Sequence, residues 1–262
     1  MASTAARCSP EEWQARQQLA GCYRVFHLLG WTELIFNHIS LRVPGTTGAP
    51  QFLINPFGLH YSEVQASNLV KVGLDGQTIG DSDWPINPAG FTPHATIHQG
   101  IAEAHCVMHT HTTAGMAVAC SKAGLEISNF YAAQLGGRLA THPFEGITVH
   151  PDEGPRLLAS VRGGAAEGGQ GAPRPAVILQ NHGLLAWGRT LPECFYTLWL
   201  MQRACEVQLA GAVLGPTLPI GAPVQAACAD AAERFYAQRG MGDDLMAALL
   251  RQVDRSDRSW RD

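Results

Sequence analysis

The segment that most restricts how this chain can fold is Ala104–Thr113, where an apolar run leads directly into two histidines. His109 and His111 are separated by one residue, and three apolar residues precede them. This pattern predicts a strand, in which residues i and i+2 project from the same face. The two imidazoles then form a pair that can bind one divalent transition-metal ion. The alternative is a strand end that carries two solvated histidines.

The composition excludes several classes of partner. Hydrophobic residues make up 46% of the 262 positions and charged residues 15%, which is typical of a globular chain with a large core. The formal net charge is −4 and basic residues form no cluster, so we expect neither nucleic acid nor a membrane as partner. The seven scattered cysteines include no C-x-x-C pair, which favours reduced thiols. No signal peptide or membrane-length apolar run is present, and we expect a cytoplasmic protein.

The N-terminal part predicts one helix followed by strands. Ser9 and Pro10 form a helix start, and Gly30 suits its C-terminal cap, which predicts a helix over residues 10–29. Alternation of apolar and polar residues predicts the next strand, and turn residues delimit two more. The predicted strands cover residues 37–43, 52–54 and 68–72, with a hairpin signal at Asp75-Gly76.

The remaining elements alternate between helices and strands within what we expect to be one domain, residues 1–262. Predicted helices cover residues 93–103, 113–120, 154–161, 191–214 and 226–239, and predicted buried strands cover 176–180 and 184–187. Residues 127–135 and 146–150 are expected to be strand or loop segments. The glycine-rich residues 163–173 predict a mobile surface loop inside the domain. Residues 212–262 are interpreted as a peripheral C-terminal extension that could pack on another subunit.

A third histidine could join the pair. His182 lies in a tight turn between the two buried strands, flanked by Asn181 and Gly183. A histidine at such a position often only forms hydrogen bonds, but the small neighbours allow a close approach that a simple hairpin does not need. Three histidines with an open fourth position are the arrangement that a catalytic metal requires.

Together these segments resemble the class II aldolase/adducin family, which includes fuculose-phosphate aldolase and the adducin head domain. The resemblance covers roughly residues 12–211 and rests on Asn37–Arg42, Asn55–Gly58, the helix with His94 and His98, Val107–Thr112 and Leu179–Gly183. It implies a three-layer α/β/α fold with a central, mainly antiparallel sheet. It also implies a homotetramer with active sites at subunit interfaces, and a divalent metal ion bound by His109, His111 and His182. Zinc is the ion expected, with Mn²⁺ and Fe²⁺ as alternatives.

The chain departs from the sugar-phosphate aldolases at two places. Their catalytic glutamate corresponds to His94, as in adducin-like members, so that His94 becomes either a fourth ligand or an acid/base group. Their phosphate-binding positions correspond to Asn37, His38, Phe57, Gly58, Thr92 and Pro93. Phe57 has no hydroxyl group and Pro93 has no backbone N–H, which argues against a phosphorylated substrate.

The function expected is that of a metal-dependent lyase of the aldolase or decarboxylase type, an aldehyde-lyase in the broad sense. Its substrate would be an unphosphorylated hydroxy-carbonyl compound or keto acid, with His94 as the catalytic group that moves protons. Asn37, His38, Phe57, Gly58 and Thr92 are the candidate substrate-binding residues. Two alternatives stay open: an Fe(II)-dependent oxygenase acting on an aromatic keto or hydroxy acid, and an adducin-like binding module without turnover.

Overall fold

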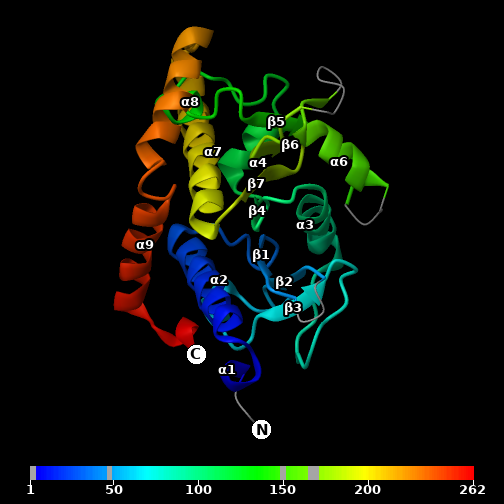
Figure 1. Ribbon diagram of the computed structural model, residues 1–262. Coiled ribbons are helices and arrows are strands. Elements are labelled where there is room, and N and C mark those ends of the chain that lie inside the picture. The colour runs from blue at the N-terminus through cyan, green and yellow to red at the C-terminus, as the bar shows by residue number, and fades with distance from the viewer. Residues whose placement is uncertain (1–3, 46–48, 148–151, 165–170) are drawn as a thin grey trace.

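A single sheet forms the centre of the protein, shown in Figure 1 as a computed structural model that describes residues 4–45, 49–147, 152–164 and 171–262. In this part of the chain the sheet has seven strands in the order β3-β2-β1-β4-β7-β6-β5. All neighbouring strands are antiparallel except β5 and β6, which are parallel. The strands are β1 (His38–Val43), β2 (Gln51–Ile54), β3 (Val70–Gly73), β4 (Cys106–Thr110), β5 (Leu139–His142), β6 (Ala176–Leu179) and β7 (Gly183–Gly188). The prediction of an α/β fold with a mainly antiparallel sheet is confirmed.

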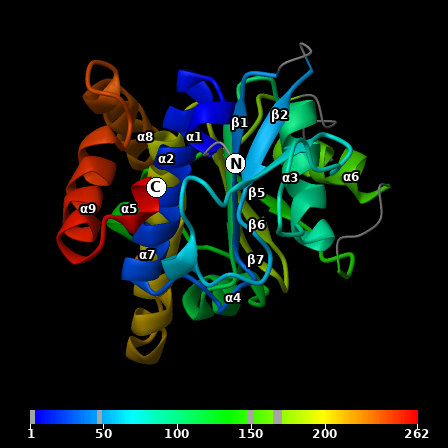
Figure 2. The same ribbon diagram turned by 90° about the horizontal axis from the view of Figure 1, so that it is seen from below.

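Helices cover both faces of this sheet and give the molecule three layers (Figure 2). On one side lie α2 (Pro10–Leu29), α7 (Leu191–Gly211) and α9 (Asp243–Ser256), and on the other lie α3 (Pro88–Gly100) and α6 (Glu153–Val161). The shorter or outer helices are α1 (Thr4–Arg7), α4 (Thr113–Ala119), α5 (Phe130–Ala133) and α8 (Ala222–Tyr236), with single 3₁₀ turns at Tyr61–Glu63, Ala212–Leu214 and Ser259–Arg261.

Strand β1 contributes to both layers because its side chains alternate between the two faces. Its apolar residues join the core beneath α2 and α7, whereas Ser40 and Arg42 form hydrogen bonds with residues of α3. Residues opposite each other on β1 and β4 include the pair His38 and His109. This register fixes the position of the candidate site, because it brings the two imidazoles to the same face of the sheet.

The predicted helix over residues 10–29 is confirmed to the residue as α2. The Ser9 side chain accepts a hydrogen bond from the backbone N–H of Glu12, and Pro10 occupies the first helical turn. Gly30 ends the helix with a φ of 73°, a conformation that glycine adopts without strain. Elsewhere, most predicted strands and helices agree with the structure to within a few residues.

Several expectations for the elements were wrong or lie partly outside the described residues. Helix α3 begins at Pro88, after Asn87, and not at Pro93, which lies inside it. Residues 130–133 form helix α5, not a strand or loop, because the Asn129 side chain accepts hydrogen bonds from two backbone N–H groups of the first turn. Strand β5 and helix α9 were not predicted. The expected segment 146–150 and the expected loop 163–173 lie partly outside the described residues.

The C-terminal residues 212–262 are not uniform in their packing. Helix α8 has no buried residue, whereas Met246 and Val253 of α9 and the nearby Trp260 join the core cluster that contains residues of α2. Arg24 of α2 pairs with Asp257, which ties this end of the chain to the α2 layer. Among the described residues, no helix combines the length and the hydrophobicity needed to cross a membrane.

Candidate metal centre

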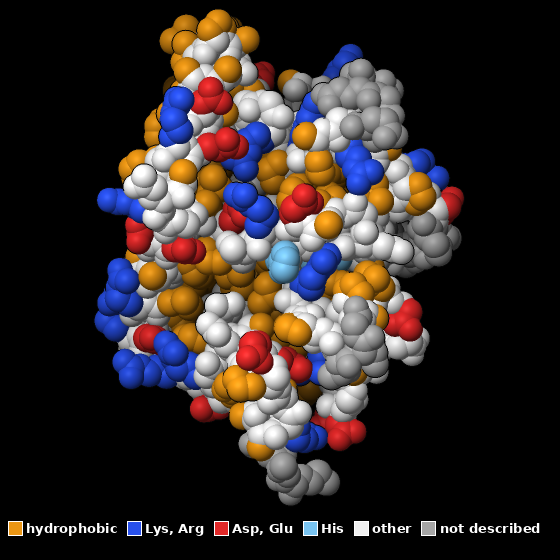
Figure 3. Space-filling model, viewed as in Figure 1, with side chains coloured by type: hydrophobic (Ala, Val, Ile, Leu, Met, Phe, Trp, Pro, Cys, Tyr) orange, Lys and Arg blue, Asp and Glu red, His pale blue; other side chains and the backbone are white. Residues whose placement is uncertain are grey.

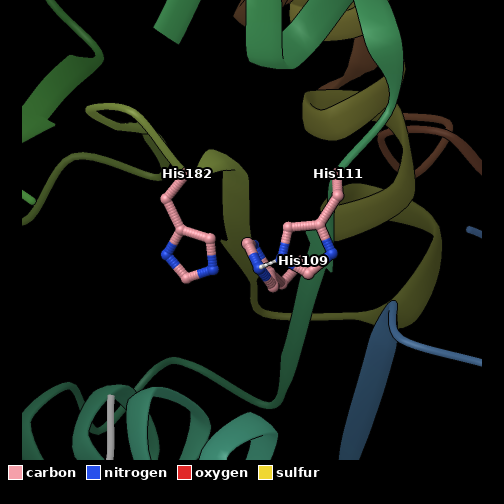
Figure 4. Close-up of side chains that lie close together, drawn as sticks. All are labelled: His109, His111 and His182. Carbon is pink, nitrogen blue, oxygen red and sulfur yellow. Dashed lines mark hydrogen bonds between the residues drawn. The ribbon is translucent and has the colours of Figure 1, made fainter. Parts of the chain in front are cut away.

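Three imidazole rings from distant parts of the sequence converge at one end of β4 (Figure 4). One nitrogen from each of His109, His111 and His182 lies within 4.8 Å of the corresponding nitrogen of the other two. The ring centroid of His182 is 4.7 Å from that of His109 and 5.0 Å from that of His111. The two residues of the H-x-H pair approach most closely, with 2.8 Å between their Nε2 atoms.

Neighbouring backbone groups hold the H-x-H pair in place. The Nδ1 atom of His109 lies 2.8 Å from the carbonyl oxygen of Leu184, which can only accept a hydrogen bond. Nδ1 therefore carries the proton, and the unprotonated Nε2, which pairs with Nε2 of His111, is the atom that could bind a metal ion. The backbone N–H of His111 donates to the Oδ1 atom of Asn37, whose Nδ2 group donates to the carbonyl oxygen of Trp31.

His182 reaches the pair because the turn before β7 is unusually close to β4. Asn181 has a φ of 56°, in the left-handed region that asparagine tolerates better than most residues. At Gly183 a Cβ atom would lie 2.3 Å from the carbonyl oxygen of Thr110, so only glycine fits there. The Asn-His-Gly sequence is thus explained by backbone geometry that presents His182 to His109.

The electrostatic surroundings keep these histidines neutral. Burial lowers the pKa of His109 well below its usual range, with further lowering by His111, His182 and His38. Burial, followed by His182, lowers the pKa of His111 to about 4, and burial followed by His142 lowers the pKa of His182. Neutral imidazole is the form that binds metal ions. Three such donors with one open side fit a divalent transition ion in a catalytic type of site.

His38 is the next imidazole outward from the cluster. Its ring stacks on that of His109 with a centroid distance of 5.6 Å and lies edge to face with that of His94 at 5.7 Å. Helix α3 packs directly against it, because a Cβ atom on Gly90 would lie 2.3 Å from the Nε2 atom of His38. His38 therefore lies between the three-histidine cluster and the buried face of α3.

Behind His38, a chain of hydrogen bonds determines which nitrogen of His94 carries a proton. The Nδ1 atom of His98 lies 2.7 Å from the carbonyl oxygen of Ala104 and must donate to it. Burial lowers the pKa of His98 and His94 to about 3, so both rings are neutral. The Nε2 atom of His98 then accepts from the Ser40 hydroxyl at 2.8 Å. Because this hydroxyl has one proton, its oxygen accepts from the Nδ1–H of His94 at 2.7 Å.

The Nε2 atom of His94 is consequently an unprotonated acceptor. It is buried and has no hydrogen-bond partner among the described residues, and the same holds for the Nδ1 atom of His38. His94 lies outside the group of described residues that could share a metal ion. The His94 and His38 rings thus each present an unpaired nitrogen in one buried region, next to the candidate metal centre.

A cavity of about 740 Å³ opens above the three imidazoles. Of the predicted substrate-binding residues, His38 and Phe57 line it; Asn37, Gly58 and Thr92 are not among its described lining residues. Asn37 instead braces the backbone near His111, and the Thr92 hydroxyl donates to the carbonyl oxygen of Pro88. Lining residues that were not predicted come mainly from irregular segments: Glu33, Leu34, Phe36, Asn87, Ala89, Gly90, Met116, Phe144, Gly146, Ile147 and Asn181.

Comparison with known proteins places this arrangement in a family. The family model described as the class II aldolase and adducin N-terminal domain matches residues 17–209, well over half of the chain. The chain belongs to the class II aldolase and adducin family. An aldolase class 2 family protein of Pseudomonas aeruginosa is 41% identical over 99% of this chain and 96% of its own length. The crystal structure of an aldolase II superfamily protein from Pseudomonas syringae superposes with a TM-score of 0.86 and 36% identity, over 100% of both chains.

The adducin branch of the family is also similar. Alpha-adducin of Rattus norvegicus is 41% identical over 196 residues, which cover 74% of this chain and 25% of the adducin. Membership of the class II aldolase and adducin family supports a lyase of the aldolase type in general terms. Class II aldolases typically depend on a divalent metal ion, and the histidine cluster is consistent with that property.

Proposed function

We propose that this member of the family is a metal-dependent carbon–carbon lyase, of the aldolase or decarboxylase type, that acts on an unphosphorylated hydroxy-carbonyl compound or keto acid. The observation that carries the proposal is the convergence of three neutral imidazoles at the floor of a cavity. His109, His111 and His182 would hold the ion, with Zn²⁺ as the first choice and Mn²⁺ or Fe²⁺ as alternatives. When bound, the ion would withdraw electrons from the substrate carbonyl group and so ease cleavage of the neighbouring bond.

Proton transfer is the task proposed for His94, acting through His38. His38 lines the cavity, whereas the fully buried His94 is not among the described residues that line it. Cleavage of an aldol removes a proton from a hydroxyl group and delivers one to carbon. His38 would exchange these protons with the substrate, and the unprotonated Nε2 atom of His94 would accept a hydrogen bond from the neighbouring His38 ring while His38 carries the proton. In this role His94 is a positioning residue for His38.

The composition of the cavity wall supports an unphosphorylated substrate. Among its described lining residues, none is Lys or Arg, and the only one with a formal charge is Glu33. A phosphate group needs charge-assisted hydrogen bonds to replace its water shell, and an acidic residue would repel it. Phe57, which lines the cavity, has no hydroxyl group to donate to a phosphate.

A homo-oligomer, with a tetramer as the expected form, is part of the proposal. Hydrophobic side chains gather on the face shown in Figure 3, over the region of α7 and α8. Four large apolar side chains on α8 or in the segment between α7 and α8 are 62–88% exposed: Val213, Leu214, Leu218 and Phe235. Apolar groups of this size in one region are typical of a surface that another protein covers. Light scattering coupled to gel filtration would test this.

The central experiment is metal analysis followed by a cleavage screen. The purified protein is expected to contain close to one Zn²⁺ per chain, and a screen of hydroxy acids and keto acids, each with and without phosphate, should yield an aldehyde or CO₂ from an unphosphorylated compound. The variant His109→Ala should lose both the metal ion and the activity. A metal-free variant with full activity would refute the proposal, and dioxygen uptake with Fe²⁺ but not Zn²⁺ would assign the site to an oxygenase.

A second candidate function is supported by the similarity to alpha-adducin, which extends over 74% of this chain. In that case the domain would bind a protein partner without turnover, and His94 in place of a catalytic glutamate would reflect a site that has lost its chemistry. Failure of every carbonyl compound in the screen, together with a partner bound in a fixed ratio, would favour this function.

A further inference from the structure

The cavity above the candidate metal centre is lined mostly by apolar side chains, and this restricts the ligands that can bind in it. The larger apolar side chains come from three irregular segments, which contribute Leu34 and Phe36, Phe57, and Phe144 and Ile147. Met116 of α4 and the smaller Ala89 and Pro93 of α3 complete the apolar part of the wall. The cavity volume of about 740 Å³ lies within the range of sites for small organic ligands. An apolar wall above a polar floor is the arrangement expected for a ligand with one polar end and one apolar end.

The first wall is formed by Leu34, Phe36 and Phe57. The backbone at Glu33 and Leu34, at the start of this wall, has an uncommon conformation. Glu33 and Leu34 have φ values of 42° and 60°, in the left-handed region that side chains other than glycine seldom adopt. Such conformations tend to occur where function requires a particular side-chain direction. The result here is that Leu34, 72% exposed, and Phe36 line the cavity, with the Phe36 ring 6.4 Å from that of Phe57.

A second wall of the cavity is formed by the segment after β5. The Phe144 ring lies edge to face with that of His182 at 6.2 Å, and Ile147 is 76% exposed. The acidic residue between them, Glu145, does not line the cavity, because Arg156 of α6 donates hydrogen bonds from Nε to both of its carboxylate oxygens at 2.9 Å. This ion pair keeps the negative charge away from the ligand space and leaves an aromatic and an aliphatic side chain facing it.

We propose that the ligand of this site is a carbonyl compound with an apolar substituent of about the size of a phenyl ring. Its oxygen atoms would face His109, His111 and His182, and its substituent would lie between the wall of Phe36 and Phe57 and the wall of Phe144 and Ile147. This inference rests on the proposed metal-dependent function and extends it to the substrate class. An aromatic substituent can stack on the aromatic side chains of these walls, and the burial of its apolar surface favours it over a smaller or charged substituent.

The test compares three probes on the Zn²⁺-loaded protein by isothermal titration calorimetry: phenylpyruvate, pyruvate and dihydroxyacetone phosphate. Phenylpyruvate should bind about 30-fold more tightly than pyruvate, because it buries one additional ring. Dihydroxyacetone phosphate should bind more weakly than phenylpyruvate. The variants Phe36→Ala and Phe57→Ala should each lower the affinity for phenylpyruvate about tenfold and leave the affinity for pyruvate unchanged. Phe130→Ala, at an exposed phenylalanine of α5 outside this cavity, is the matched control and should change neither affinity.

The outcomes separate this inference from the proposed function. Selective binding of phenylpyruvate without cleavage of any aromatic aldol or keto acid would support the inference and refute the lyase. Cleavage activity with equal affinity for phenylpyruvate and pyruvate, or with tighter binding of dihydroxyacetone phosphate, would overturn the inference and leave the lyase intact. If Phe36→Asp dissociates an oligomer and the affinities for phenylpyruvate and pyruvate are equal, the apolar walls belong to a subunit contact and the inference is wrong.

Discussion

Replacement of Ser40 by alanine provides the most direct test of the buried hydrogen-bond chain. In the native protein the Ser40 hydroxyl accepts from the Nδ1–H of His94 and donates to Nε2 of His98. Both imidazoles are buried, so Ser40→Ala leaves one donor and one acceptor without a partner in a region that water does not reach. Each such group costs about 1–3 kcal/mol, which gives a decrease of about 2–6 kcal/mol in the free energy of unfolding.

The assay is urea denaturation of the metal-free protein at pH 7.5, with Ser62→Ala as a matched control. Ser62 also pairs with a histidine, since its hydroxyl lies 2.8 Å from Nδ1 of His60, but this pair is only partly buried. Water can replace the lost partner there, so the control should change the free energy of unfolding by less than about 1 kcal/mol. With a slope of about 3 kcal/mol per molar urea, Ser40→Ala should lower the midpoint by about 1 M.

A second readout distinguishes the proton assignment from general packing. The ¹⁵N chemical shifts of the wild-type imidazoles should identify His94 and His98 as neutral rings protonated at Nδ1. In Ser40→Ala the assignment of His94 is no longer imposed, and signals of the Nε2-protonated form should appear. A wild-type His94 protonated at Nε2, or a Ser40→Ala midpoint no lower than that of Ser62→Ala, would refute the reasoning.

Three further predictions concern the same region. His182→Ala should abolish binding of Zn²⁺ in equilibrium dialysis, and retention of wild-type affinity would mean that the ion is held without this residue. Burial lowers the pKa of His94 and His98 from 6.5 to about 3, so between these values the unfolded chain binds protons that the native protein excludes. These two histidines should therefore leave the free energy of unfolding of the metal-free protein constant above about pH 6.5. Below that pH each of them should lower it by about 1.4 kcal/mol per pH unit. Equal urea midpoints at pH 7.5 and pH 5 would contradict this prediction. Gly90→Ala places a Cβ atom 2.3 Å from Nε2 of His38 and should reduce turnover at least about tenfold with the zinc content unchanged, whereas Gly211→Ala, where no atom lies within 4 Å, should be neutral.

Much of the architecture could be predicted from local patterns. The apolar run before His109 gave strand β4, the signals at Ser9 and Gly30 gave α2, and the near-continuous apolar segments gave β6 and β7. The approach of His182 to His109 and His111 was expected from the small residues that flank it and from the family resemblance. These features depend on spacing along the chain, which the sequence displays directly.

Other features depend on contacts that local patterns do not contain. Pro93 suggested a helix start, but α3 begins five residues earlier, at Pro88 after Asn87. Strand β5 is short and gains its stability from parallel pairing with β6, a partner more than thirty residues later in the chain. The position of His94 behind His38 follows from the register of β1 against β4 and from the close packing of Gly90.

The missed lining residues of the cavity have a related explanation. Leu34, Phe36, Phe144 and Ile147 lie in irregular segments, where exposed apolar side chains show no periodicity that would set them apart. The left-handed conformations of Glu33 and Leu34 are also unexpected, because neither residue is glycine or asparagine. An apolar side chain at the mouth of a cavity can be distinguished from one on the open surface only when the surrounding elements are in place.

The alternation of side chains along β1 has a consequence for the engineering of this protein. A slip of one residue in the pairing of β1 with β4 would turn His38 and Ser40 toward α2 and bring Ile39 and Leu41 beneath α3. Such a slip would break the core and dismantle the proton chain in a single step. Insertions or deletions near this strand should therefore lower both stability and activity. Laboratory evolution of the ligand preference should instead change residues 33–36 and 143–147, which lie outside the sheet.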